Sequence, residues 1–261
     1  MEFCQKKESE MFDLAADYYD RYRPSYPLEI IQSLVEYANV TKDSNLLEIG
    51  AGSGKATELL EGYGCKIHCV EVGEHLVERG KEKFAKNPNI SFECGRFEEL
   101  KIQEQTYDVI FAAQAFHWIL QPIGDELCHR YLRKHGVLAP FWNMYLYDGS
   151  KEQQELVALS NRFGGFADFV SEKEVENRKR RIVKEIEASG LFQVEKGVEV
   201  HWTHEYSVEE YCGFLQTGNH FLGLSEETKQ EAFQEVETLA MKYGGKIRRP
   251  YLTVLYLAKR I

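Results

Sequence analysis

Short apolar runs alternate with amphipathic segments between about residues 45 and 140. Runs such as Leu46-Leu47 and Val109-Ile110-Phe111 are apolar at consecutive positions, which is typical of parallel strands covered on both faces. The segments between them repeat apolar residues every three or four positions, as amphipathic helices do. This alternation predicts stacked βαβ units. With two later runs included, the expected strands are residues 45–50, 66–72, 90–94, 107–113, 136–141, 192–202 and 251–258.

The regions that flank this core are predicted to be mainly helical. Phe12, Ala15 and Tyr19 lie at helical spacing in an N-terminal arm, and a second helix is expected with Pro27 in its first turn. At 261 residues the chain is short for two domains, so a single domain is expected. Its expected parts are a helical arm (1–43), a cofactor-binding core (44–143), a helical cap insertion (144–190) and C-terminal strands and helices (191–261).

Proline, glycine and serine residues mark several expected boundaries. Pro122 suits a helix start, Gly136 a helix stop, and Pro250 the entry to the last strand. Ser207 with Glu210 forms a capping-box sequence, so a helix is expected to begin there. A further helix is expected after Ser225, ending at Gly244-Gly245.

Charge and composition exclude several classes of protein. The 32 Lys and Arg against 42 Asp and Glu give a net charge of −10, which disfavours nucleic acid as a partner. No apolar run approaches the roughly 20 residues of a spanning helix, so no membrane partner is expected. The N-terminus has no signal-peptide pattern, and the six cysteines form no CxxC pair, so a cytoplasmic protein with reduced thiols and no metal site is expected.

The sequence Glu48-Ile49-Gly50-Ala51-Gly52-Ser53-Gly54 follows a predicted strand and opens a predicted helix. Glycines there allow a ligand to approach the backbone at the helix N-terminus. The next strand ends at Glu71, 21 residues after Gly50, close to the offset at which a carboxylate binds ribose hydroxyls. Together the loop and Glu71 predict a nucleoside-containing cofactor.

Local details separate the possible cofactors. The loop is G-x-G-x-G and has Lys55 where a dinucleotide fingerprint has its third glycine, which weakens the case for NAD. Gly50 and Gly54 enclose three residues where a P-loop has four, which disfavours ATP. Glu48 would repel a pyrophosphate but could orient a ligand with an amino group. A cationic, phosphate-free cofactor fits best.

The segment from Glu48 to Gly54 resembles the first motif of class I S-adenosylmethionine-dependent methyltransferases. The stretch from Tyr107 to Trp118 resembles the fourth strand and following loop of their type 11 small-molecule branch, which includes trans-aconitate methyltransferase-like enzymes. The arm Tyr18 to Pro24 and the segment Tyr206 to Phe221 also resemble that branch. The resemblance implies an α/β, Rossmann-like, doubly wound sheet of seven strands with the last strand antiparallel, and S-adenosyl-L-methionine as cofactor.

The resemblance also implies a set of site residues. The glycine loop would pass under the cofactor, Glu71 would bind its ribose, Phe97 would flank its adenine, and Gln114 with Ala115 would border its methionine end. Two arm residues, Tyr19 and Arg23, are expected to close over it. The complete expected cofactor set is Glu48, Gly50, Ala51, Gly52, Gly54, Glu71, Val72, Arg96, Phe97, Gln114, Ala115, Tyr19 and Arg23.

The methyl acceptor is less well defined by the sequence. Methyl transfer from an activated sulfonium needs alignment of the acceptor more than it needs a base. If the acceptor is a hydroxyl group, His117 is the best-placed candidate base. Alternatively, His117 packs its ring in the wall of the pocket. For a carboxylate acceptor, arginines would matter more. The expected acceptor residues are Trp118, Trp142, His204, Tyr206, Asn219 and His220. A small-molecule O-, N- or carboxyl methyltransferase, monomeric or homodimeric, is favoured over an NAD-dependent oxidoreductase or a non-catalytic cofactor-binding protein.

Overall fold

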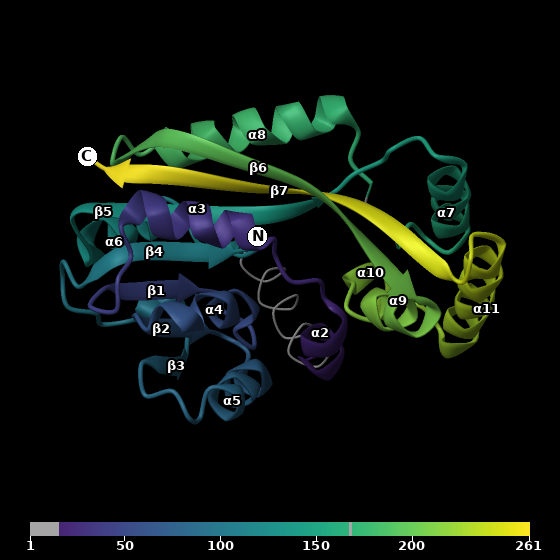
Figure 1. Cartoon of the computed structure of the whole chain (residues 1–261), viewed down its shortest axis with the longest axis horizontal. Coiled ribbons are helices and arrows are strands. Elements are labelled where there is room, and N and C mark those ends of the chain that lie inside the picture. The colour runs from purple at the N-terminus through teal and green to yellow at the C-terminus, as the bar shows by residue number, and fades with distance from the viewer. Residues whose placement is uncertain (1–15, 167–168) are drawn as a thin grey trace. The chain divides into compact units, whose positions relative to one another are not determined.

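The structure is a computed structural model that describes residues 16–166 and 169–261. The described residues form an α/β fold around one seven-stranded sheet in the order β3-β2-β1-β4-β5-β7-β6, with the last strand antiparallel, as predicted (Figure 1). Its strands are β1 (Asn45–Ile49), β2 (Lys66–Glu71), β3 (Ile90–Cys94), β4 (Tyr107–Ala113), β5 (Leu132–Tyr145), β6 (Phe192–Ser207) and β7 (Lys246–Arg260). Strands β1 to β5 pair in parallel, so their carboxyl ends share one edge of the sheet.

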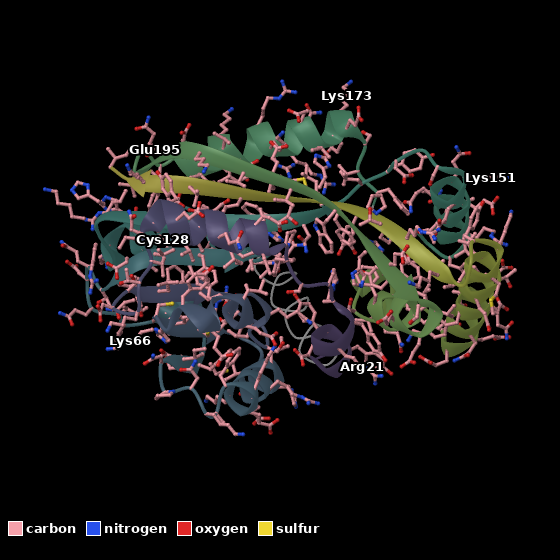
Figure 2. The ribbon with its side chains drawn as sticks, viewed as in Figure 1. Arg21, Lys66, Cys128, Lys151, Lys173 and Glu195 are labelled. Atoms are coloured by element: carbon pink, nitrogen blue, oxygen red, sulfur yellow. The ribbon has the colours of Figure 1, made fainter. Side chains whose placement is uncertain are left out.

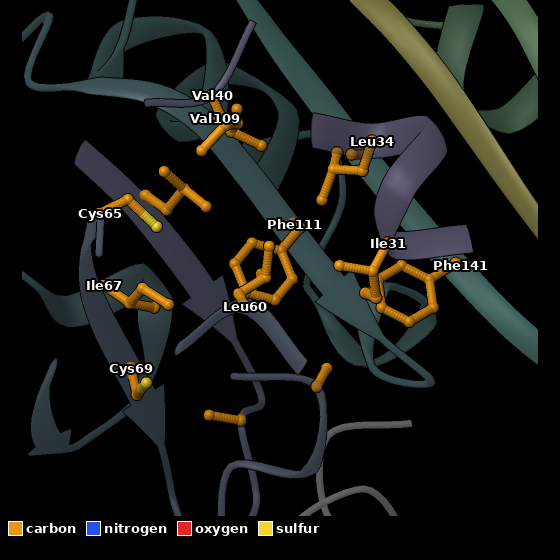
Figure 3. Close-up of a cluster of buried hydrophobic side chains, with 14 of the residues drawn as sticks. Ile31, Leu34, Val40, Leu60, Cys65, Ile67, Cys69, Val109, Phe111 and Phe141 are labelled. Carbon is orange, nitrogen blue, oxygen red and sulfur yellow. The ribbon is translucent and has the colours of Figure 1, made fainter. Parts of the chain in front are cut away.

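The central strands are buried on both faces, which explains why their sequences are apolar throughout. Leu46 and Leu47 point to opposite faces of β1 because side chains alternate along a strand, and both are fully buried. In Figure 3 the side chains of Ile31 and Leu34, from the second helix, lie near Phe111 and Phe141 of β4 and β5. Burial of this apolar surface, at about 25 cal/mol per Å², is the main force that holds the helices to the sheet.

The helices occupy the positions that their sequences predict, with small shifts at the ends. Pro27 precedes the second helix, and the Ser207 side chain forms the predicted capping box with Glu210. The α-helices are α2 (Ala16–Tyr22), α3 (Leu28–Ala38), α4 (Lys55–Leu60), α5 (Glu74–Lys83), α6 (Ile123–Tyr131), α7 (Lys151–Arg162), α8 (Glu172–Glu187), α9 (Val208–Leu215), α10 (Asn219–Leu222) and α11 (Glu226–Lys242). Phe12 and Ala15, in the expected arm helix, lie outside the described residues. No helix of the described chain has the length and apolar character needed to cross a membrane.

Two boundary expectations are wrong. Gly136 does not stop a helix: α6 ends at Tyr131, and β5 begins at the next residue, fully buried Leu132. The pairing of β4 with β5 jumps from Tyr107↔Leu132 to Val109↔Val137, so Gly136 lies in a bulge, where a Cβ would approach Leu132 to 2.9 Å. Likewise β7 begins at Lys246, and Pro250 lies inside the strand.

The chain divides into two compact units. Of the described residues, unit 1 comprises 16–24, 144–166, 169–175 and 201–252, and unit 2 comprises 25–143, 176–200 and 253–261. Unit 2 contains the glycine loop and the strands β1 to β4. In unit 1, α2 packs against α9, and α11 packs against both α7 and α9. The division falls within the expected cap insertion, because residues 144–175 belong to unit 1 and the rest of α8 belongs to unit 2.

Candidate active site

The glycine loop joins β1 to α4 and is fixed to the neighbouring strand. The amides of Gly50 and Ala51 both donate to the carbonyl of Val70 in β2, at 2.8 and 3.1 Å. Gly50, Gly52 and Gly54 all have positive φ angles, of 67°, 57° and 83°. These left-handed conformations strain any residue with a side chain, so the repeated glycines follow from the path of the backbone.

Two of these glycines also face close neighbours. A Cβ on Gly50 would lie 2.4 Å from the Cβ of Ala115, so the loop after β4 closes directly onto the loop after β1. Gln114 is held there with a positive φ of 59° while its side-chain amide donates to the Asn143 carbonyl at 3.1 Å. A Cβ on Gly54 would instead meet the ring of Phe84 at 2.6 Å. The structure thus brings Gly50, Gln114 and Ala115 together.

Glu71 ends β2 beside the glycine loop. Its Oε2 accepts a hydrogen bond from the Gly52 amide at 2.8 Å, and its Oε1 accepts from the amides of Val72 and Gly73 at 2.8 and 3.0 Å. Its exposed fraction is 9%. Three backbone donors therefore fix the position of this carboxylate beside the glycine loop.

Glu48 is the second acid at the loop, and it is almost completely buried. Thr57 of α4 donates its hydroxyl to Glu48 Oε2, and the same hydroxyl lies 3.2 Å from Cys69 Sγ. Burial raises the pKa of Glu48 to about 8, an effect that the Thr57 hydrogen bond only partly offsets. Glu48 is therefore mostly protonated at neutral pH, whereas the sequence argument assumed that it carries a negative charge.

The residues expected near an adenine ring differ in accessibility. Val72, next to Glu71, is 42% exposed and offers apolar surface. Phe97 is only 3% exposed, and its ring packs edge-on against Tyr131, with centroids 6.1 Å apart. Arg96 precedes it and is partly buried. Of these three, Val72 presents the most surface to a ligand.

His117 and Trp142 meet at the carboxyl ends of β4 and β5. The indole Nε1 of Trp142 donates to His117 Nδ1 at 3.2 Å, and the Trp118 ring lies 4.8 Å from the His117 ring. Desolvation by the surrounding protein, and then the nearby Arg181 guanidinium, lower the pKa of His117 to about 4. The imidazole is therefore neutral at pH 7, although part of the side chain stays exposed.

Comparison with known proteins relates the glycine loop and the strands around it to a known family. Residues 47–139 match the family described as the methyltransferase domain. This segment is a methyltransferase domain. The match confirms the predicted class I, S-adenosylmethionine-dependent methyltransferase domain and, with it, the cofactor.

Individual relatives are similar to parts of this chain. An uncharacterized methyltransferase of Schizosaccharomyces pombe is 30% identical over 127 residues, which cover 48% of this chain and 49% of that protein. A Saccharomyces cerevisiae protein, named as a probable S-adenosylmethionine-dependent methyltransferase, is 25% identical over 64% of this chain and 57% of its own length. The alignments with the S. pombe relatives thus span about half of each relative's length.

Solved structures extend the likeness of the fold beyond the matched segment. A protein from Anaeromyxobacter dehalogenans, named provisionally as a type II methyltransferase, superposes with a TM-score of 0.64 at 17% identity. The superposition covers 92% of this chain and 98% of that protein. At this identity it shows a shared fold.

The donor set of the methyltransferase domain fits S-adenosylmethionine. The carboxylate of Glu71 would accept hydrogen bonds from ribose hydroxyls, and the left-handed glycines leave the backbone open to close approach. A carboxylate at this place also binds the ribose of dinucleotides, so Glu71 does not separate the two cofactors. The glycine pattern, with Lys55 where a dinucleotide fingerprint has its third glycine, fits a sulfonium nucleoside better than a dinucleotide.

The remaining expected site residues lie in unit 1. Arg23 donates to the Tyr145 hydroxyl at 2.9 Å and to the Thr217 carbonyl at 3.0 Å, and its guanidinium lies 5.5 Å from the Tyr19 ring centroid. Tyr206 is fully buried and shares a hydrogen bond of 2.6 Å with the Tyr251 hydroxyl, so it is a core residue.

Three other expected acceptor residues are also in unit 1. The His204 ring lies against Tyr206, with centroids 4.3 Å apart, and burial lowers its pKa. Asn219 and His220 begin α10, and the His220 side chain is exposed. Their role as acceptor contacts stays a prediction.

Two residues that organise the methyltransferase domain were not predicted. Thr57 holds Glu48 by a hydrogen bond. Asn143 connects three segments of the chain. Its backbone carbonyl accepts from Gln114, its side-chain amide donates to the Ser25 carbonyl at 3.2 Å, and its side-chain oxygen accepts from Thr253 at 2.6 Å. The signal for Asn143 was its place as a polar residue inside the apolar run from Phe141 to Met144. A buried polar group in a strand requires partners, so it marks a junction.

Proposed function

We propose that this chain is an S-adenosylmethionine-dependent methyltransferase whose acceptor is a small acidic molecule. The observation that carries the proposal is the hydrogen bond from the Gly52 amide to Glu71 Oε2. It connects the glycine loop, within the matched domain, to the carboxylate that is expected to bind the ribose. Bound S-adenosylmethionine supplies an electrophilic methyl group. The chain's own contribution is alignment and exclusion of water, which together can lower a barrier by about 7–11 kcal/mol.

Within the site, each residue has a distinct proposed task. Glu71 binds the ribose hydroxyls, and the amides of the glycine loop approach the cofactor from below. Gln114 and Ala115 border its methionine end, held by the contacts of Gln114 with Asn143 and of Ala115 with Gly50. These assignments follow from the positions of the residues at the carboxyl ends of β1, β2 and β4.

The acidic character of the acceptor is supported by Arg23 in unit 1. In the described part of the chain no carboxylate pairs with Arg23, whose guanidinium contacts only neutral oxygens and the rings of Tyr19 and Phe214. Its Nε is buried without a hydrogen-bond partner. Because an uncompensated buried charge is unfavourable, a ligand anion would stabilise this group.

Calorimetric titration with S-adenosylmethionine, S-adenosylhomocysteine and NAD tests the cofactor. The expected result is micromolar binding of the first two, near −8 kcal/mol, and none of NAD. Binding of NAD alone would instead indicate an oxidoreductase and overturn the proposal.

Turnover requires a separate measurement, since a cofactor-binding protein without activity would pass the titration. A screen of small carboxylic acids, phenols and amines, read out as S-adenosylhomocysteine formation, is expected to give turnover with one or more acids. The Arg23→Gln variant should lose activity toward an acid. Arg21→Gln serves as the control, because Arg21, in the last turn of α2 just before Arg23, is exposed (Figure 2) and pairs with Glu209. Turnover of neutral acceptors only would refute the acidic class.

A further inference from the structure

The contact between Trp142 and His117 determines which nitrogen of the histidine ring carries the proton. An indole Nε1 can only donate a hydrogen bond, so His117 Nδ1, at 3.2 Å, must accept it. In a neutral imidazole the other nitrogen then bears the hydrogen. The His117 ring therefore presents an Nε2–H donor and no free basic nitrogen.

The position of His117 gives this donor a functional setting. It lies two residues after Ala115, whose Cβ occupies the space that a Cβ on Gly50 would need. The ring thus belongs to the same loop that closes onto the glycine loop in unit 2. His117 is exposed, and Trp118 and Trp142 flank its ring with apolar surface.

We infer that Trp142 holds His117 as a hydrogen-bond donor, whose Nε2–H binds an oxygen atom of the methyl acceptor, and that His117 is not the general base. The part that concerns the acceptor rests on the proposed function, whereas the state of the ring is a property of the chain alone. Because His117 does not remove a proton from the acceptor, the acceptor oxygen must already be nucleophilic when it binds. Carboxylate and enolate oxygens meet this condition, whereas an un-ionised alcohol that needs a base does not.

The local electrostatics agree with this assignment. Desolvation opposes a positive charge on the ring, and the nearby Arg181 of α8 opposes it further, so the pKa of His117 falls. Both effects keep the imidazole neutral and preserve its acceptor nitrogen for Trp142. A base with so low a pKa would be a weak proton acceptor at neutral pH.

Nuclear magnetic resonance of the ring nitrogens tests the inference without cofactor or acceptor. In ¹⁵N-labelled protein at pH 7, the histidine signals lost in His117→Gln identify this ring. Long-range proton–nitrogen correlations should show Nε2 protonated and Nδ1 unprotonated. In Trp142→Phe both forms should appear, while Trp118→Phe, which removes a neighbouring indole that makes no hydrogen bond to His117, should keep the wild-type pattern.

Two results would overturn the inference. One is a proton on Nδ1 in the wild-type ring, which is observed without Trp142→Phe and so counts even if that variant fails to fold. The other is a wild-type pattern retained in folded Trp142→Phe, which would remove Trp142 as the positioning residue. Neither result depends on cofactor binding, so each can be told apart from failure of the proposed function.

Kinetics with an acceptor from the screen test the role of the donor. His117→Gln should raise the acceptor KM several-fold and leave the pH profile of kcat unchanged. A loss of kcat of about a hundred-fold or more, together with loss of a titrating limb near pH 6–7, would identify a base and contradict the inference.

Discussion

The Oε2 atom of Glu71 lies 2.8 Å from the amide nitrogen of Gly52, so a single hydrogen bond connects the ends of two adjacent parallel strands. The other oxygen of the same carboxylate accepts from Val72 and Gly73. Glu71 thus fixes the conformation of the glycine loop, in addition to its proposed role in binding ribose hydroxyls.

This dual role gives the first prediction. Glu71→Ala should weaken binding of S-adenosylhomocysteine by about 1–3 kcal/mol, because the backbone donors and the ligand hydroxyls both lose their acceptor. Titration calorimetry provides the measurement. Glu74→Gln, an exposed neighbour at the start of α5, is the matched control and should bind normally. Unchanged affinity in Glu71→Ala would remove Glu71 from the site.

Glu48 should make stability depend on pH. Its pKa is raised from 4.5 to about 8 by burial, so between these values the folded chain binds more protons than the unfolded chain. The contribution of Glu48 to the free energy of unfolding is therefore complete below pH 4.5. It is lost as pH rises toward 8, by up to about 5 kcal/mol. Glu48→Gln keeps an acceptor for Thr57 but cannot ionise, so its unfolding free energy should exceed that of the wild type at pH 8. Parallel denaturant titrations from pH 5 to 8 that show the same pH dependence for both proteins would contradict this assignment.

Asn143 should contribute strongly to the stability of unit 2. Asn143→Ala removes the acceptor of the fully buried Thr253 hydroxyl and the donor to Ser25, so a loss of about 1–3 kcal/mol is expected from urea unfolding. A double variant that also carries Thr253→Val separates the contribution of the Asn143–Thr253 hydrogen bond from that of the other contacts of Asn143. If the two residues act through their shared bond, the double variant should lose less than the sum of the single losses.

Gly213 in α9 should be intolerant of any side chain. A Cβ there would lie 2.3 Å from the ring of Tyr22 in α2, so Gly213→Ala must displace Tyr22 and the arm helix. A loss of about 1–3 kcal/mol is expected from such overpacking. Gly62→Ala, where a Cβ meets nothing within 4 Å, serves as the control in thermal unfolding. Equal losses of stability in the two variants would show that the Tyr22 ring does not require the space left by Gly213.

Sequence reasoning located the core of the fold because each signal was local. Continuous apolar runs identified the buried strands, and the 21-residue offset identified Glu71, since both reflect the geometry of one βαβ unit. Gly136 was misplaced because helix stops and strand bulges both favour glycine, and only the pairing of β4 with β5 distinguishes them. The proton state of His117 could not be predicted, because it depends on Trp142, 25 residues away in the chain.

The distribution of thiols has a practical consequence for chemical labelling. Burial raises the pKa of the Cys65, Cys69 and Cys128 thiols, so these three should resist alkylation in the folded protein. Cys94 ends β3 with an exposed side chain, immediately before the segment that contains Arg96 and Phe97. Among the described cysteines it should therefore react first with a maleimide, as peptide mapping would reveal. A dye attached there would sit next to the strand edge where the cofactor is expected, and could serve as an optical sensor of its binding.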